Sequence, residues 1–255
     1  VSSDLHAAVK SRAGDMGLAM REEQENICPF IALPTSFDEY LKGLKKSVRY
    51  DIRRRTKVIL EEKGGSIDVC TGPDRATEGI DTLVQLHHAR WMSRNDPGTL
   101  GRPGLANFLR DVCANPPEGS SYRLYLLKCG GKPVGAFFVF YYGESSLYYQ
   151  AGWDPNSPLE RYSPGMVLMA RSIQDAIEAG LRYYEFLRGE ESYKFRWTKS
   201  TRRTITLLAA RSTAARTYLR TAQAKDLVKR LLGRGPTPPA STAETVEEAA
   251  EQRQD

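Results

Sequence analysis

The segment FLRGEESYKFRW, residues 186–197, gathers ionisable and aromatic side chains around a glycine. The candidates for chemistry after the glycine are Glu190, Glu191, Tyr193, Lys194, Arg196 and Trp197. A phenol can donate a hydrogen bond or a proton to a reacting group, and cationic side chains can bind phosphates or an acidic substrate. The alternatives are that Tyr193 packs with its hydroxyl paired and that Lys194 and Arg196 stay solvated. The segment is therefore our first candidate for a reaction centre.

Glu185 lies in a predicted strand, RYYEFLRG at residues 182–189, between aromatic residues. A carboxylate in such surroundings is costly unless it is paired or functional. Glu185 could accept a proton from an attacking amine or hydroxyl, directly or through water. Equally, it could be the structural partner of a basic side chain, for which the candidates are Arg90, Lys194 and Arg196.

The sequence Ser163-Pro164-Gly165 opens a predicted helix. Proline at a helix start gives up an N–H group that would be unpaired anyway, and glycine lets the backbone come close to a ligand. The free N–H groups of this turn, together with the helix dipole, suit a phosphate. A plain helix cap is the alternative. The predicted anion-binding residues are Ser163, Pro164, Gly165, Met166, Val167 and Leu168.

Arg90 and Trp91 end another predicted helix and could line a substrate cleft. The guanidinium would bind an anion and the indole would offer a stacking face, although Trp91 could equally pack at the helix end. Gln150, in a predicted strand, joins them as a candidate substrate-binding residue. His87 falls on the apolar side of its helix, so we expect His87 and His88 in the core or on the surface rather than in catalysis.

The composition is typical of a soluble globular chain: 255 residues, 40% hydrophobic, 27% charged, with no apolar run of 18 residues or more. The four cysteines are far apart and form no C-x-x-C pair, which argues against a zinc knuckle or a dithiol redox site. We expect reduced thiols, a cytoplasmic setting and no metal or redox cofactor. The start, VSSDLHAAVK, lacks both a methionine and a secretory apolar core, so we expect a fragment.

The net charge of +6 favours an anionic partner, which could be a nucleic acid, a membrane surface or a phosphorylated small molecule. Much of the positive charge lies in residues 45–57 and 211–234. The first run could bind nucleic acid or be a solvated helix face. The second includes a predicted basic amphipathic helix, residues 212–232, which could rest on an anionic membrane or pack against the domain.

Hydrophobic periodicity and turn residues predict an alternation of helices and strands. The predicted helices cover 35–60, 75–92, 105–114 and 166–179, with a short helix or loop at 191–199. The predicted strands are 66–70, 122–129, 134–143, 146–154, 182–189 and 202–210. Three of these strands, joined by tight turns, predict an antiparallel meander.

This order of elements resembles the GNAT acyltransferase fold. Within it, the motifs ARW (89–91), SPG-x-x-L (163–168) and EFLRGEESYKFRW (185–197), with Gly180 at a helix end, resemble the CelD/BcsL-type branch. That branch is associated with bacterial cellulose and other exopolysaccharide loci and is related to the Fem aminoacyl transferases. The resemblance spans residues 28–210. The Q/R-x-x-G-x-G/A signature of other GNAT enzymes is missing, and RYSPGMVL occupies its place.

The resemblance implies an α/β fold with a central mixed, mostly antiparallel sheet flanked by helices. It also implies an acyltransferase domain (35–210) and an N-terminal segment that is the remnant of an upstream GNAT-like half (1–34). The residue pattern and composition predict the other two parts, a basic C-terminal helix (211–232) and a disordered tail rich in Pro, Thr, Ala and Glu (233–255).

By the same resemblance, the chain moves an acyl group from acyl-CoA, such as acetyl-CoA, to an amine or hydroxyl, for example of a saccharide. The turn at Gly165 would hold the pyrophosphate where two strands splay apart, Tyr193 would assist the leaving thiolate, and Glu185 would be the base. Acyl-carrier protein and aminoacyl-tRNA stay open as donors. The alternatives are a Fem-like tRNA-dependent transferase, a catalytically degenerate binding or scaffold protein, and a nucleic-acid binder that uses residues 45–57.

Overall fold

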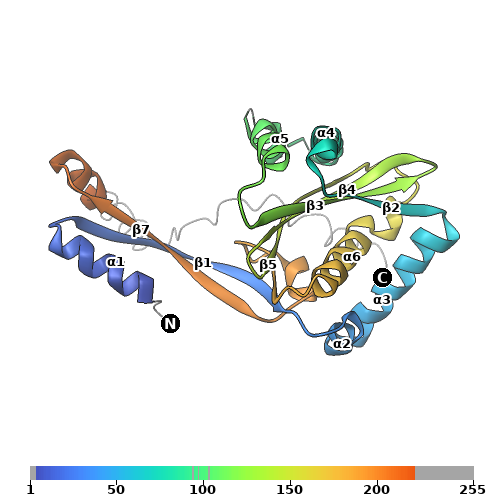
Figure 1. Cartoon of the computed structure of the whole chain (residues 1–255), viewed down its shortest axis with the longest axis horizontal. Helices are drawn as coiled ribbons and strands as arrows, with labels where there is room; N and C mark the ends of the chain where they lie inside the picture. The colour runs from blue at the N-terminus through green and yellow to red at the C-terminus, as the bar shows by residue number, and fades with distance from the viewer. Residues whose placement is uncertain (1–3, 94, 97, 103, 222–255) are drawn as a thin grey trace. The chain divides into compact units, whose positions relative to one another are not determined.

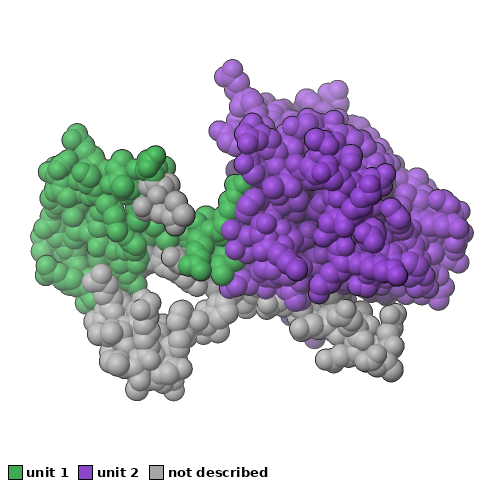
Figure 2. All heavy atoms as spheres, turned by 90° about the horizontal axis from the view of Figure 1, so that it is seen from below, with its two compact units in different colours: residues 1–28, 202–255 green, residues 29–201 purple. Residues whose placement is uncertain are grey.

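The computed structural model describes residues 4–93, 95–96, 98–102 and 104–221 (Figure 1). The chain divides into two compact units, residues 29–201 and residues 1–28 with 202–255 (Figure 2). The candidate site residues all belong to the unit 29–201.

A seven-stranded sheet has the order β2-β3-β4-β5-β6-β1-β7. Its strands are β1 (Ala19–Ala32), β2 (Gly65–Cys70), β3 (Ser120–Cys129), β4 (Lys132–Tyr142), β5 (Ser145–Trp153), β6 (Tyr183–Glu185) and β7 (Thr201–Ala210). The run from β2 to β5 is antiparallel, β5 and β6 are parallel, and β6 pairs antiparallel with β1. The predicted mixed, mostly antiparallel sheet and its meander are therefore confirmed.

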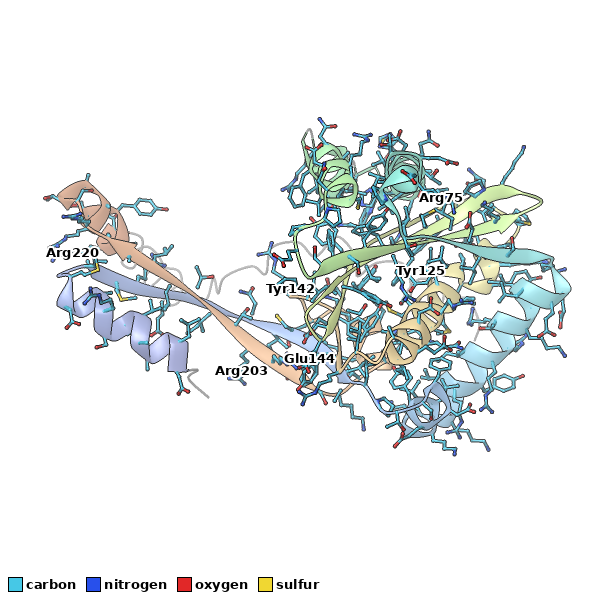
Figure 3. The ribbon with its side chains drawn as sticks, viewed as in Figure 1. Arg75, Tyr125, Tyr142, Glu144, Arg203 and Arg220 are labelled. Carbon is cyan, nitrogen blue, oxygen red and sulfur yellow. The ribbon has the colours of Figure 1, made fainter. Side chains whose placement is uncertain are left out.

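Helices cover both faces of the sheet in the unit 29–201 (Figure 1). The helices are α2 (Phe37–Gly43), α3 (Lys46–Lys57), α4 (Ala76–Met92), α5 (Leu105–Ala114) and α6 (Pro164–Glu178). Along β4, Phe137 and Val139 pack with α2, α3 and α6, whereas Phe138 packs with α4 and α5. Tyr125 of β3, labelled in Figure 3, belongs to the first of these cores. We call the two sides the α6 face and the α4 face.

Local backbone chemistry explains where the elements differ from the sequence prediction. The predicted helix 35–60 is instead α2, α3 and a π-helical turn, Val58–Glu62, with Ser36 capping α2 by accepting the Glu39 N–H at 3.2 Å. The predicted strand 182–189 shortens to β6, because Leu187 has φ of 59° and leaves the extended region. The long strand β1 was not predicted.

The other unit contains α1 (Asp4–Asp15), most of β1 and β7, and helical residues from 213 to 221. Glu22 pairs with Lys10 and His6, and Arg216 donates to the carbonyl of Gly17 at 2.6 Å. Figure 3 shows Arg203 on β7 and Arg220 on the helix that follows. The predicted helix 212–232 is thus helical as far as it is described, and its remainder and the predicted tail 233–255 lie outside the described residues. Within the described ranges, no helix combines the length and apolarity needed to cross a bilayer.

Candidate active site

β5 and β6 run parallel but pair over only three residues each. The pairing joins residues 145–147 to residues 183–185, and β5 then continues to Trp153 past the end of β6. Helix α6 forms the crossover between the two strands. In sheets with parallel strands, ligands bind beyond the carboxyl ends of the strands, where neighbours part. We therefore place the candidate active site at this end of β5.

A β-bulge in β5 directs the side chains there. Phe138 of β4 pairs with Gln150, and the next residue, Val139, pairs with Tyr148, so Tyr149 is the extra residue. Because side chains alternate along a regular strand, Tyr148 and Gln150 would otherwise share a face. Instead Tyr148 packs in the core of the α6 face, whereas Gln150 bonds to the loop after α4.

The register assigns the two predicted catalytic residues to opposite faces of the sheet. Glu185 pairs with Leu147, which in turn pairs with Phe140, and Phe140 packs on the α4 face. Glu185 therefore lies on the α4 face, and it is 9% exposed. Tyr193 packs against the core of the α6 face. One ligand could contact both residues only where β5 and β6 have parted.

Tyr193 lies in a 3₁₀ turn, Ser192–Arg196, in surroundings that favour its protonated form. Burial raises the pKa of Tyr193 well above its ordinary value, and Tyr148, with which it shares a hydrogen bond, and the Glu191 carboxylate raise it further. The charge of Arg90 opposes this rise. A phenol in this state donates a hydrogen bond at neutral pH and does not act as a phenolate base.

Lys194 stabilises the loop that carries Tyr193 by contacts within the loop. Its ammonium group is 2.6 Å from the Glu191 carboxylate and donates to the carbonyl oxygens of Arg188 at 3.0 Å and Gly189 at 3.5 Å. Lys194 is only 3% exposed. We predicted Lys194 as a substrate-binding residue, but its burial and these partners make it a structural residue of the loop.

Arg196 and Trp197 connect the same segment to α3 and α2 by an ion pair and a hydrogen bond. The Arg196 guanidinium is 3.7 Å from the Asp51 carboxylate of α3, and the carbonyl of the buried Trp197 accepts the Tyr40 hydroxyl of α2 at 2.8 Å. Arg196 was predicted to bind substrate, and the structure gives it this intramolecular partner. The polar crowding of residues 186–197 thus builds a rigid support for Tyr193.

The start of α6 has an unusual backbone conformation. Ser163 is left-handed, with φ of 54° and ψ of 67°, and Pro164 occupies the first helical turn. Arg55 of α3 donates to Ser163 Oγ at 2.5 Å. The predicted residues Met166, Val167 and Leu168 point their side chains into the core, at 4%, 1% and 1% exposure, so they can offer a ligand only their backbone.

Gly165 packs against the Trp153 indole at the end of β5. A Cβ atom at Gly165 would lie 3.3 Å from the ring, so a larger residue would press on it. The Arg90 guanidinium stacks on the same ring, 3.5 Å from the Trp153 centroid, and is 5.4 Å from the Trp91 centroid. Arg90 also lowers the pKa of His87 and opposes the rise at Tyr193, so its charge acts on both faces.

Further cations surround the start of α6. The Lys63 ammonium is 5.9 Å and the Arg161 guanidinium 4.9 Å from the centroid of the Tyr162 ring. Together with Arg55 and Arg90 they raise the positive potential at a helix end whose dipole is already positive. Such a helix start favours phosphate groups.

On the α4 face, Gln150 donates from Nε2 to Thr99 Oγ1 at 2.9 Å, and Thr99 Oγ1 is 3.5 Å from His87 Nε2. Burial, and secondarily the charge of Arg90, lower the pKa of His87 to about 4, so the ring is neutral near pH 7. Trp91 is 7% exposed and packs against His87, with ring centroids 5.9 Å apart. Trp91 therefore packs at the end of its helix, which was the alternative to a role in lining a substrate cleft.

The sequence prediction missed four residues that build this site: Arg55, Thr99, Tyr148 and Trp153. Arg55 was noticed only as part of the basic run 45–57. A phosphate site at Ser163 gives no signal that points to Arg55, 108 residues earlier in the chain. The roles of Tyr148 and Trp153 depend on the bulge, which no residue pattern marks.

A comparison with protein families identifies residues 46–195 as a match to the acetyltransferase (GNAT) domain. A search among curated proteins found no match.

Solved structures show similar folds. FemX aligns with a TM-score of 0.58 at 11% identity, over 86% of this chain and 72% of that one. L-PGS from Bacillus licheniformis aligns with a TM-score of 0.55 at 16% identity, over 89% and 71%. The C-terminal domain of a lysylphosphatidylglycerol synthetase from Agrobacterium fabrum gives 0.51 at 12% identity, over 84% and 68%. At these identities the likeness concerns the fold alone.

Proposed function

Because the chain belongs to the acetyltransferase (GNAT) domain family and is an acyltransferase, we propose that it moves an acyl group from acyl-CoA to an amine or hydroxyl. Acetyl-CoA is the first candidate donor, used as a co-substrate rather than as a bound cofactor. The observation that carries the proposal is that the pairing of β5 with β6 ends at Leu147 and Glu185, while β5 runs on to Trp153, whose ring lies against Gly165 at the cationic start of α6. A thioester could enter between the strands while its phosphates bind at the helix.

The donor phosphates would bind the backbone at Gly165 and the side chains of Arg55, Arg161 and Lys63. These cations lie on or beside the turn that opens α6, and charge-assisted hydrogen bonds to phosphate are strong. Arg90, stacked on Trp153, would neutralise charge nearer to the thioester. The buried side chains of residues 166–168 would act as the rigid base of this site.

The reaction would be a direct transfer within a ternary complex. The acceptor nitrogen or oxygen attacks the thioester carbonyl carbon, the new C–N or C–O bond forms, and the C–S bond breaks. Tyr193 keeps its proton and can hydrogen-bond or protonate the leaving thiolate. Glu185 accepts the proton of the acceptor, directly or through water. The position of these residues on opposite faces supports this division, because the nucleophile and the thiolate are separate substituents of the tetrahedral carbon and each needs its own proton-transfer group.

For the acceptor, we propose an amino sugar or a growing polysaccharide in the cytoplasm. This rests on the resemblance of residues 163–168 and 185–197 to the CelD/BcsL-type branch. We further propose that the transferase domain comprises residues 35–210, preceded by a remnant of an upstream GNAT-like half in 1–34. The basic helix within 211–232 would provide peripheral contact with an anionic membrane.

A second candidate is transfer from an aminoacyl-tRNA, as in the Fem relatives. One observation favours it: the solvent face of α3 combines exposed cations with an exposed aromatic residue, Tyr50 at 61%. The residues of this face are Lys46, Tyr50, Arg53, Arg54 and Lys57. Cations that follow a phosphate backbone, with a ring for base stacking, suit single-stranded nucleic acid.

Calorimetric titration of the full chain with acetyl-CoA and longer acyl-CoAs tests the proposal. We expect saturable binding that Gly165→Glu abolishes, because the new side chain presses on Trp153 and brings a negative charge to the phosphate site. Gly43→Glu is the matched control, since nothing lies within 4 Å of a Cβ at Gly43. If no acyl-CoA binds but charged tRNA does, the second candidate replaces the first. If neither binds, the chain is a GNAT-fold binding or scaffold protein.

A further inference from the structure

The Gln150 side chain is held by contacts that the proposed acyl transfer does not require. Its Nε2 donates to Thr99 Oγ1 at 2.9 Å, and this oxygen lies 3.5 Å from His87 Nε2. Thr99 begins a 3₁₀ turn, Thr99–Gly101, in the connection from α4 to α5. The chain of contacts therefore ties the bulged part of β5 to a buried imidazole of α4.

The position of the proton on His87 limits how Gln150 can be oriented. The ring is 1% exposed, and among the described residues its Nδ1 has no hydrogen-bond partner, so Thr99 is the group that contacts a ring nitrogen. A neutral imidazole carries one N–H; if Nδ1 carries it, Nε2 accepts the Thr99 hydroxyl proton. Thr99 then has only lone pairs to offer Gln150. The carboxamide must turn its NH₂ group to Thr99 and its carbonyl oxygen away from it.

The carbonyl oxygen of Gln150 is then available on the side from which a second substrate would come. Gln150 is half-buried, and the bulge places it on the α4 face, the same face as Glu185. The donor phosphates are proposed at α6, which covers the other face. A nucleophile that attacks the thioester carbonyl from the α4 face would therefore approach past Gln150 and Glu185.

We propose that His87 and Thr99 are positioning residues that hold the Gln150 carbonyl oxygen as the hydrogen-bond acceptor for the N–H or O–H group of the second substrate. The inference rests on the proposed acyl transfer and adds the atom that orients the nucleophile. It also sets the substrate class. A neutral amine or a hydroxyl can donate to this oxygen, whereas a carboxylate offers only lone pairs and would be rejected.

The first test reads the His87 proton directly and needs no substrate. The full chain has three histidines, so a long-range ¹H–¹⁵N correlation spectrum of protein labelled with ¹⁵N-histidine is simple to assign with the variant His87→Gln. We expect His87 to be neutral at pH 7 with its proton on Nδ1. A proton on Nε2 would overturn the proposal, because Thr99 could then donate to Gln150 and reverse the carboxamide.

The second test separates positioning from structural support by kinetics with a panel of amines and alcohols. Thr99→Val keeps the shape and removes the hydroxyl, so we expect KM for the acceptor to rise about tenfold, the effect of one lost hydrogen bond, with an unchanged Kd for acetyl-CoA. Thr99→Ser should restore KM. Thr82→Val is the matched control, because the Thr82 hydroxyl only bonds to the Glu78 carbonyl of its own helix.

An unchanged acceptor KM in Thr99→Val would overturn the positioning role, as would equal losses of donor and acceptor binding. The two proposals can fail separately. Absence of acyl-CoA binding by the unmodified chain removes the acyl transfer and with it the role of Gln150. A proton on His87 Nε2 in a chain that binds acyl-CoA removes only the positioning role.

Discussion

The two faces of the sheet at the end of β5 are built on different physical principles. On the α6 face, the start of α6 is surrounded by permanent charges, with Arg55 on Ser163 and Arg90 on Trp153. On the α4 face, which also carries Glu185, neutral groups follow one another: Gln150, Thr99 and a His87 ring whose pKa is held low. Charge attracts an anion over a distance with little demand on direction, whereas neutral hydrogen bonds demand direction. The α6 face is thus suited to binding a polyanionic donor and the α4 face to orienting a neutral nucleophile.

The largest effect should come from the loop that supports the α6 face. Lys194→Met leaves the Glu191 carboxylate buried without its 2.6 Å partner, so the free energy of unfolding should fall by about 3–5 kcal/mol. Urea denaturation at pH 7 measures this. Arg182→Ala removes an exposed pair with Glu144 and serves as the control, with an expected loss of less than about 1 kcal/mol. A similarly small loss for Lys194→Met would show that the loop does not depend on the buried pair.

The next largest effect is the pH dependence of the free energy of unfolding that His87 on the α4 face should produce. The pKa of His87 is about 4 in the folded protein and about 6.5 in an unfolded chain, so between these values the unfolded chain binds the extra proton. The free energy of unfolding should therefore fall as pH drops from about 6.5 to about 4, by on the order of 3 kcal/mol. Urea midpoints measured across this range should show a weaker pH dependence in His87→Gln.

The pH range in which His87 affects the free energy of unfolding is separate from the range in which Asp68 affects it. Hydrogen bonds from Arg75 and Lys128 lower the pKa of Asp68 below its ordinary range, so its contribution is lost only at more acidic pH. Equal slopes for the unmodified chain and His87→Gln between pH 6.5 and 4 would contradict a buried neutral His87.

A third test separates chemistry from binding on the α6 face. Tyr193→Phe removes the proton donor while keeping the ring, so kcat should fall about 100-fold, the lower range for a general acid. The Kd for acetyl-CoA should stay unchanged, because the phosphate site is elsewhere. Steady-state kinetics with calorimetry measure both quantities. Tyr142→Phe, at a residue that is 64% exposed (Figure 3), is the control. If kcat survives in Tyr193→Phe, the leaving thiolate takes its proton from another group.

The smallest effect should distinguish binding of the donor by charge from orientation of the acceptor by a directed hydrogen bond. Arg55→Ala removes the guanidinium bonded to Ser163 and should raise the Kd for acetyl-CoA about tenfold at low salt. The difference should shrink as NaCl rises, because ions screen exposed charges. Gln150→Leu should raise the acceptor KM with no comparable dependence on salt. A salt-independent defect in Arg55→Ala would mean that Arg55 acts by holding the turn at Ser163 rather than by its charge.

Much of the fold could be predicted from residue patterns. The alternation of apolar residues in 122–154 and the helical stripe in 166–179 specify the meander and α6, because these periods are set by local backbone geometry. The strand β1 could not be predicted in this way. A run of six polar residues, 21–26, interrupts its apolar pattern, and residues 30–32 pair with β6 residues more than 150 positions away.

The candidate site was predictable in its residue types but not in their roles. Lys194 and Tyr193 are adjacent in the sequence, yet one is buried in an ion pair with Glu191 and the other packs beside Tyr148. Charged and hydroxyl-bearing residues show that a segment could take part in chemistry. The distances from each side chain to its partners distinguish a structural residue from a reactive one.

By itself, the sequence determined most of the elements, the helix start at Ser163-Pro164-Gly165 and the concentration of polar chemistry in 186–197, because each depends on neighbours within a few residues. Only the tertiary structure decided which face each side chain serves. One extra residue in β5, Tyr149, turns Gln150 away from Tyr148, and an early end to β6 separates the strands. Both depend on pairing between distant strands, where a shift of one residue exchanges the two faces.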